Sequence, residues 1–166
     1  MTQNKFHIEY HSCFSETRDY LYEGDKYWMD DGIEEIEIHQ RVADRCKGKV
    51  LIGGLGLGLI VNMLLKNKEV TKIIVVEKEQ EVFDLVKSRL NIDWSSNYKE
   101  KIEFKIMDMK TYVYNTRERF DYVYIDIVPV ASPKSYATIS LPLKKKAERI
   151  APPYNIICYE EEKGDI

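Results

Sequence analysis

Three carboxylates, Glu77, Asp108 and Asp126, each stand at the end of a short apolar run, and a glycine-rich segment, residues 53–58, ends another such run. A carboxylate accepts hydrogen bonds from the hydroxyl or amino groups of a ligand, or takes a proton from one. Glycines let the backbone turn sharply and approach a ligand without a Cβ in the way. If the runs are parallel strands, their carboxyl ends meet at one edge of a sheet, where such sheets bind ligands. The pattern therefore indicates one ligand site built from these four elements.

Gly54, Gly56 and Gly58 alternate with leucines between a predicted strand and a predicted helix. The N-terminus of that helix would present free N–H groups to a ligand held by the turn. The dinucleotide fingerprint GxGxxG is broken, because its third glycine position falls on Leu59 or Val61. The spacing therefore favours a nucleoside ligand without a pyrophosphate. The alternative is a glycine-rich turn that binds nothing.

Alternating strands and helices after Gly48 predict a doubly wound, Rossmann-like α/β sheet of mainly parallel strands. The predicted strands are Lys49–Ile52, Lys72–Val76, Ile102–Ile106, Tyr122–Ile125 and Asn155–Tyr159. The predicted helices are Leu59–Lys66, Glu79–Leu90, Met109–Thr116 and Leu141–Ile150. Because the first and fourth strands are continuously apolar while the third alternates, we expect the first and fourth in the middle of the sheet and the third at an edge.

The N-terminal part, residues 1–47, is predicted to form a β-hairpin and a helix ahead of a core at residues 48–166. Phe6–Tyr10 alternates as a half-buried strand, and Glu23–Lys26 is a turn cluster between two aromatic runs. Apolar residues recur at helical spacing from about residue 33 to residue 46. The aromatic side chains beside the turn either wall an acceptor pocket or pack the hairpin.

The composition indicates one folded domain, since 166 residues with 44% apolar and 32% charged side chains exclude a disordered chain. A net charge of −3 gives no global attraction to nucleic acid or to an anionic membrane. Cys13, Cys46 and Cys158 lack any spacing that suits zinc, so we expect reduced thiols and no metal site. Neither a leader nor a membrane-spanning run is recognisable, so a cytoplasmic protein is expected.

These motifs resemble the class I S-adenosylmethionine-dependent methyltransferases over roughly residues 20–160. Within them the chain is similar to the spermidine-synthase-like branch and to short phage-type proteins with a Gly-Leu-Gly-Leu-Gly loop. The resemblance implies S-adenosyl-L-methionine as a cofactor held by that loop, with Glu77 on the ribose and Asp108 on the adenine amino group. The structural alternatives are a solvated acid at Glu77 and a helix N-cap at Asp108.

Asp126 is the candidate catalytic residue, because the end of the fourth strand faces the acceptor side of such a site. Its alternative is an acid that only shapes the pocket. The segment Asp126-Ile127-Val128-Pro129 matches neither the Asn-Pro-Pro-Tyr of amine and base methylators nor the Asp-Ser-Ser-Asp of aminopropyl transferases. Glu35 and His39 share one helical face, and spermidine synthases carry a Glu-x-x-x-His pair in the corresponding helix. They either contact the substrate or form a packed histidine satisfied by a local carboxylate.

We expect from these features a methyltransferase that acts on a small or peptide-borne nucleophile. The alternatives are an aminopropyl transferase, a lyase or hydrolase that consumes S-adenosylmethionine, and a non-catalytic binding protein. The chain ends directly after the fifth predicted strand, so the sheet is expected to be truncated there. Either the strand Phe6–Tyr10 or a second subunit is expected to cover the outer edge of that strand, and we favour a homo-oligomer, most simply a dimer.

Overall fold

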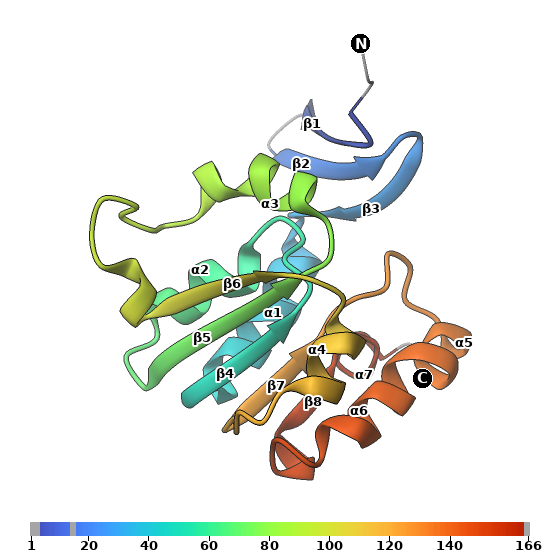
Figure 1. Ribbon diagram of the computed structural model, residues 1–166. Helices are drawn as coiled ribbons and strands as arrows, with labels where there is room; N and C mark the ends of the chain where they lie inside the picture. Colours follow the sequence, from blue (N-terminus) through green and yellow to red (C-terminus); the bar gives the residue numbers. More distant parts are fainter. Residues whose placement is uncertain (1–3, 14–15, 165–166) are drawn as a thin grey trace.

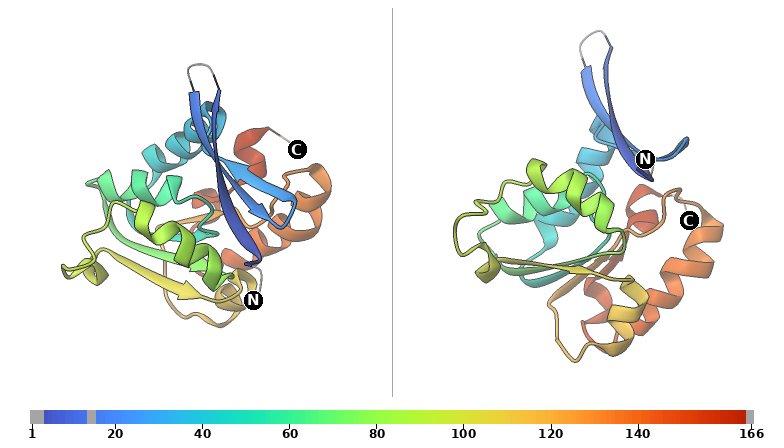
Figure 2. Two further views of the ribbon diagram at one scale, coloured as in Figure 1. Left: turned by 90° about the horizontal axis from the view of Figure 1, so that it is seen from above. Right: turned by 45° about the horizontal axis from the view of Figure 1, so that its top comes forward.

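The computed structural model describes residues 4–13 and 16–164 and contains two sheets (Figure 1). The N-terminal sheet is antiparallel and lies at one end of the molecule, above the carboxyl edge of a larger parallel sheet (Figures 1 and 2). It has the order β1-β2-β3, with the bounds β1 (Phe6–Cys13), β2 (Glu16–Glu23) and β3 (Lys26–Asp30). The tight turn between β2 and β3 contains Gly24 at a φ of 55°, a left-handed conformation that favours glycine.

The parallel sheet confirms the predicted Rossmann-like fold class. Its strands are β4 (Gly48–Gly53), β5 (Val70–Glu77), β6 (Ile102–Ile106), β7 (Tyr122–Ile125) and β8 (Ile156–Cys158). The order is β6-β5-β4-β7-β8, and every neighbouring pair is parallel. The two continuously apolar strands, β4 and β7, are interior and the alternating strand β6 is at an edge, as the sequence predicts.

Helices cover both faces of this sheet (Figure 1). Their bounds are α1 (Ile33–Arg45), α2 (Leu59–Lys66), α3 (Gln80–Val86), α4 (Met109–Asn115), α5 (Pro133–Ser135), α6 (Leu141–Ala147) and α7 (Tyr159–Lys163). Helices α1, α2 and α3 pack on one face of the sheet with Val50 and Ile52 of β4. Helices α4 and α6 pack on the other face with Leu51. This alternation follows from the period of two along a strand, and it buries β4 on both sides.

The N-terminal sheet is attached to the region of α3. Phe6 of β1 is fully buried and contacts the edge of the Trp28 ring, with ring centroids 5.0 Å apart. Arg89, just after α3, forms ion pairs with Asp19 of β2 and with Asp31, the latter at 3.7 Å. These contacts hold the β2–β3 hairpin over the carboxyl ends of the parallel strands.

Several details differ from the sequence prediction. β1 pairs with β2 along its whole length in a separate sheet, so of the two alternatives for the outer edge of β8, cover by this strand is wrong. A short helix, α7, follows β8, and a π-helical turn at Tyr136–Ser140 precedes α6, in a segment for which no element is predicted from the sequence. Among the described residues β8 pairs only with β7, and the homo-oligomer stays a prediction.

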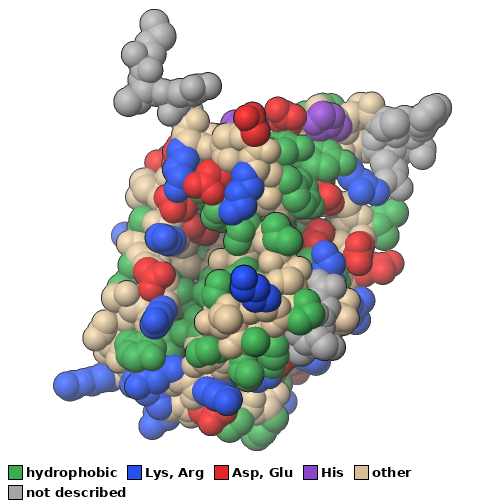
Figure 3. All heavy atoms as spheres, turned by 90° about the vertical axis from the view of Figure 1, so that its right-hand side faces the viewer, with side chains coloured by type: hydrophobic (Ala, Val, Ile, Leu, Met, Phe, Trp, Pro, Cys, Tyr) green, Lys and Arg blue, Asp and Glu red, His purple; other side chains and the backbone are tan. Residues whose placement is uncertain are grey.

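The two described thiols, Cys46 and Cys158, are free and buried, and burial raises the pKa of each to about 12. The side chain of Cys13 lies outside the described residues. No helix within residues 4–13 and 16–164 is long and apolar enough to cross a membrane. On the face that carries α5 to α7, histidine side chains lie at the hairpin end among acidic and basic ones, whereas most charged side chains at the opposite end are lysine and arginine (Figure 3).

Candidate active site

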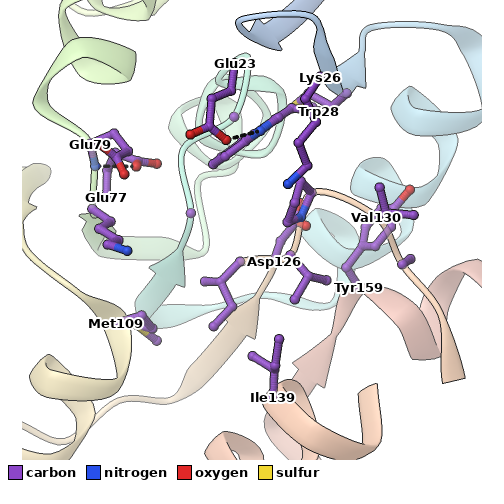
Figure 4. A pocket seen from close by; sticks show the side chains of 18 of the residues that line it. Glu23, Lys26, Trp28, Glu77, Glu79, Met109, Asp126, Val130, Ile139 and Tyr159 are labelled. Carbon is purple, nitrogen blue, oxygen red and sulfur yellow. Dashed lines mark hydrogen bonds between the residues drawn. The ribbon is translucent and has the colours of Figure 1, made fainter. Parts of the chain in front are cut away.

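A cavity of about 540 Å³ lies at the carboxyl edge of the parallel sheet, beneath the β2–β3 hairpin. Figure 4 shows its arrangement: Glu77 and Met109 lie on one side, Tyr159 and Val130 lie on the other, and Asp126 lies between them. The position agrees with the rule that doubly wound sheets bind ligands beyond the carboxyl ends of their strands. The cavity therefore has two halves, one at the ends of β4, β5 and β6, and one at the ends of β7 and β8.

The glycine loop lines the first half through Gly54 and Gly56. A Cβ at Gly54 would lie 1.9 Å from the backbone oxygen of Asp126, and the φ of Gly54 is 92°. A Cβ at Gly56 would lie 2.3 Å from the sulfur of Met29, which also accepts the N–H of Leu57 at 3.2 Å. The end of β7 and the β2–β3 hairpin thus approach the loop so closely that only glycine fits at positions 54 and 56 without rearrangement.

Gly58 has a different surrounding. It precedes α2 at a φ of 81°, and a Cβ there would lie 2.5 Å from Leu90 and 3.2 Å from Val86. It does not line the cavity. A glycine is needed at position 58 because the loop packs closely against the residues at and after the end of α3, and not because a ligand approaches it.

Glu77 is the last residue of β5 and is buried, with 6% of its surface exposed. One carboxylate oxygen accepts the N–H of Leu55 and the other accepts the N–H of Glu79, both at 2.8 Å. Burial raises the pKa of Glu77, while these backbone hydrogen bonds act in the opposite direction. A carboxylate offers about four lone-pair sites, so roughly two remain for a ligand in the cavity.

Asp108 is the N-cap of α4, so the structural alternative from the sequence is confirmed. Its Oδ1 accepts the backbone N–H of Thr111 at 2.9 Å and the Thr111 hydroxyl at 3.2 Å. Because both bonds use Oδ1, Oδ2 is the atom that Asp108 can offer to a ligand. The residue lines the cavity beside Met109, whose thioether suits a flat apolar ring.

Asp126 and His39 form a largely buried ionisable pair in the site. The Nε2 atom of His39 lies 3.3 Å from Oδ2 of Asp126, and its Nδ1 atom lies 2.7 Å from the backbone oxygen of Glu35. Both partners are acceptors, so the arrangement favours a doubly protonated imidazole. Burial lowers the pKa of His39, but the hydrogen bond and charge of Asp126 outweigh it, and the pKa is raised. His39 thus holds the carboxylate of Asp126 in a fixed orientation at the cavity.

Glu35 adds a second acid on the same side of the cavity. Its Oε1 accepts the hydroxyl of Tyr159, and its Oε2 lies 3.8 Å from Nδ1 of His39. Burial raises the pKa of Glu35, with the hydrogen bond from Tyr159 and the charge of His39 acting against it. Glu35 lines the cavity, whereas His39 is buried and contacts Asp126, so the histidine is packed as in the second alternative and contact of the pair with a substrate stays a prediction.

Tyr159 was missed from the sequence, where it is the last residue of a predicted strand. The available signal was its position, because it follows β8 at the same edge where Glu77 and Asp126 end their strands. The aromatic residues of the hairpin divide between the two expected roles. Tyr27 and Trp28 line the cavity, whereas Tyr20 and Tyr22 stack on the outer face of the sheet.

Comparison with known proteins identifies a family. Residues 36–146 match the family described as "Spermine/spermidine synthase domain". A curated relative, polyamine aminopropyltransferase 2 of Hyperthermus butylicus, is 29% identical over 107 residues, which cover 63% of this chain and 33% of that protein.

Two solved structures share the fold. The spermidine synthase of Thermotoga maritima superposes with a TM-score of 0.53 at 18% identity, covering 87% of this chain and 53% of that chain. A spermidine synthase in complex with the transition-state analogue AdoDATO gives a TM-score of 0.52 at 16% identity, covering 87% of this chain and 52% of that chain. The chain thus spans about half the length of these structures and a third of the curated relative.

The family match corrects two predictions. The methyltransferase activity predicted from the motifs is wrong, because the matching family is that of spermidine synthases, which the sequence supported only as an alternative. The prediction of S-adenosyl-L-methionine as a methyl-donating cofactor is also wrong. The donor in aminopropyl transfer is decarboxylated S-adenosylmethionine, which is a substrate. The resemblance to the spermidine-synthase-like branch is confirmed, whereas the likeness to phage-type proteins receives no support.

Proposed function

The chain belongs to the spermine/spermidine synthase domain family, and on that basis we propose that it transfers an aminopropyl group from decarboxylated S-adenosylmethionine to an amine. The name of the curated relative, a polyamine aminopropyltransferase, supports this reaction. The structural observation that carries the proposal is the position of Asp126, between the two halves of the cavity and paired with a buried histidine.

The adenosine part of the donor would occupy the half of the cavity beside β4, β5 and β6. The remaining lone pairs of Glu77 suit the two ribose hydroxyls, and Oδ2 of Asp108 suits the adenine amino group. Gly54 and Gly56 expose backbone to the ligand at this point. We assign no ligand contact to Gly58, because it packs against the end of α3.

The charge of the second half supports a decarboxylated donor over S-adenosylmethionine itself. Asp126 and Glu35 both face the space where the tail of the donor would extend. Two carboxylates there attract the ammonium group of an aminopropyl chain and repel the carboxylate that S-adenosylmethionine carries. The same charges attract a cationic amine acceptor.

The proposed step is an in-line displacement at the aminopropyl carbon bonded to sulfur. The acceptor nitrogen forms a bond to this carbon as the carbon–sulfur bond breaks, and the electron pair of that bond neutralises the sulfonium as a thioether. The nitrogen loses one proton, which Asp126 accepts from its position beside the reacting groups. The hydrogen bond from His39 orients Asp126 before this transfer.

Product analysis by mass spectrometry tests this reaction. The purified chain is incubated with decarboxylated S-adenosylmethionine and 1,4-diaminobutane, and we expect methylthioadenosine together with the aminopropylated diamine. S-adenosylmethionine as the donor should give neither product. Methylthioadenosine formed without the amine would indicate a lyase or hydrolase, and donor binding with no product would indicate a binding protein, so either result would overturn the proposal.

The substitution Asp126→Asn separates catalysis from binding. Loss of a general base lowers turnover by about 10²–10⁴-fold, whereas the affinity for methylthioadenosine should change far less, because Asp126 lies outside the adenosine half. Equal losses in both quantities would mean that Asp126 only shapes the pocket. The matched control is Asp84→Asn, an exposed acid of α3 that does not line the cavity.

A further inference from the structure

The acceptor half of the cavity carries its own charge pattern, and the following inference rests on the proposed aminopropyl transfer. This half lies between Asp126 at the end of β7 and Tyr159 at the end of β8, with the hairpin above it (Figure 4). Its anionic groups lie deep in the cavity, and its cationic groups lie at the rim. This separation bears on how many positive charges an acceptor can carry.

The two deep anions, Asp126 and Glu35, lie on opposite nitrogens of the His39 ring. The distances are 3.3 Å from Nε2 to Asp126 and 3.8 Å from Nδ1 to Oε2 of Glu35. Both acids line the cavity, although their side chains are only 22% and 12% exposed. Two separate carboxylates suit two amino groups of one small acceptor: the reacting group at Asp126 and a second ammonium at Glu35.

The two rim cations, Lys26 and Lys163, come from different elements. Lys26 starts β3 and extends from the hairpin into the cavity (Figure 4), and Lys163 ends α7 with its ammonium 5.7 Å from the centre of the Tyr159 ring. Both side chains are exposed, and neither has a carboxylate within ion-pair distance in residues 4–13 and 16–164. Lys5, a third lysine of the lining, differs because it bridges Glu23 and Glu79 at 2.9 and 3.3 Å.

The wall between the deep acids and the rim is apolar. The segment Ile127–Ala131 contains five uncharged residues in a row, and Ile139 adds a sixth from the π-helical turn. Val130 and Ile139 are 60% and 45% exposed. A methylene chain can lie against this wall, but the wall offers no carboxylate to a further ammonium group.

We propose that Lys26 and Lys163 limit the charge of the acceptor, so that a short diamine is accepted and a triamine, whose third ammonium would reach the rim, is rejected. The third ammonium meets two cations there that form no ion pair with the described residues, whereas the acids Glu23 and Glu79 of the lining are already held by Lys5. Between exposed charges the repulsion is modest, roughly two- to threefold in affinity for each lysine at separations of several ångströms in water. It is also screened by salt, because the Debye length falls from about 30 Å at 0.01 M to about 10 Å at 0.1 M.

A comparison of 1,4-diaminobutane with spermidine as acceptors tests the proposal. The wild-type chain should prefer the diamine in kcat/KM, and the double substitution Lys26→Gln with Lys163→Gln should raise the ratio of triamine to diamine roughly five- to tenfold at low salt. The substitutions Lys26→Glu and Lys163→Glu should raise it further. In the wild-type chain the preference for the diamine should weaken as salt increases. The matched control is Lys110→Gln, an exposed lysine of α4 outside the cavity, which should leave the ratio unchanged.

The same comparison can be made without turnover. Calorimetry with methylthioadenosine bound gives the affinities of the two amines directly, and they should show the same preference and the same response to the double substitution. An unchanged ratio in the double variant, or equal use of both amines by the wild-type chain, would overturn the role of the lysines. If calorimetry shows the amine preference but no aminopropyl transfer occurs, the proposed reaction would be wrong, while the proposal that the two lysines limit the charge of the acceptor would still hold.

Discussion

The pair of His39 and Asp126 makes a quantitative prediction about stability and pH. The substitution His39→Gln retains one amide group that can donate either to Asp126 or to the backbone oxygen of Glu35, but not to both. The side chain is 2% exposed, so a partner that loses its hydrogen bond stays away from water. We therefore expect a loss in the free energy of unfolding rather than a change confined to activity.

The size of this loss follows from the two contacts of His39. A neutral hydrogen bond contributes about 0.5–1.5 kcal/mol and one to a charged group about 1.5–3 kcal/mol. The contact to Asp126 is long at 3.3 Å, so its lower value applies, and because glutamine keeps one of the two contacts the expected loss is about 0.5–1.5 kcal/mol near pH 6. Asp126→Asn in the same background should show a coupling energy of about 0.5–3 kcal/mol with His39→Gln, as expected for residues in contact.

The dependence on pH has a definite sign. The pKa of His39 is raised in the folded chain, so its contribution is fully present below the ordinary value of about 6.5 and is lost as the pH rises through the raised value. The groups facing this ring are Glu35 from α1, Asp126 and Tyr124 from β7, and Tyr159 from the start of α7. The difference between wild type and His39→Gln should therefore shrink from pH 6 toward alkaline pH.

Urea unfolding of the four chains of this double-mutant cycle, at pH 6 and again well above neutrality, measures both quantities. His7→Gln is the matched control, because His7 is 43% exposed on the outer sheet and a surface substitution should stay within about 0.5 kcal/mol. A coupling energy of zero at pH 6, or one that is identical at both pH values, would refute the ion pair. His39 would then be a neutral packed histidine.

Two further predictions concern the donor half. Glu77→Gln should weaken methylthioadenosine binding by about 1–3 kcal/mol in calorimetry; unchanged affinity would remove Glu77 from the binding site. Because the folded pKa of Glu77 is raised, its stabilising contribution is present below about 4.5 and lost as the pH rises through the folded value, so Glu77→Gln should flatten the stability profile there. Gly54→Ala should cost roughly 3–5 kcal/mol of stability in urea unfolding, from backbone strain and overlap with a carbonyl, whereas Gly56→Ala, which meets the flexible Met29, should cost about 1–2 kcal/mol. Equal costs would contradict the difference in their neighbours.

The parallel sheet was predictable because its residues carry local signals. The apolar runs of β4 and β7 match burial on both faces, and the alternating run of β6 matches an edge. The sequence places Glu77 and Asp126 at the ends of strands because the end of an apolar run can be recognised from the local sequence. The position of the site followed from the fold rule alone.

The remaining features depend on contacts that the local sequence does not encode. His39 and Asp126 are 87 positions apart, so their pairing is a result of the tertiary fold. Gly58 lies in the same motif as Gly54, and only the packing of Leu90 separates their roles. The reaction was mispredicted for a related reason. Methyl and aminopropyl donors share the adenosine part, so residues that suit this part cannot distinguish them, and the charges that we propose to distinguish them are those of Asp126 and Glu35.

The close approach of Gly54 to the carbonyl of Asp126 bears on how this site can diverge during evolution. Any side chain at Gly54 would displace the backbone of the strand end that carries Asp126, so this position is restricted to glycine as long as the strand end keeps its place. The segment Ile127–Ala131 and Ile139 are partly exposed and carry no such constraint. New acceptor preferences should therefore arise by exchange of this wall, while Gly54 of the donor loop is retained.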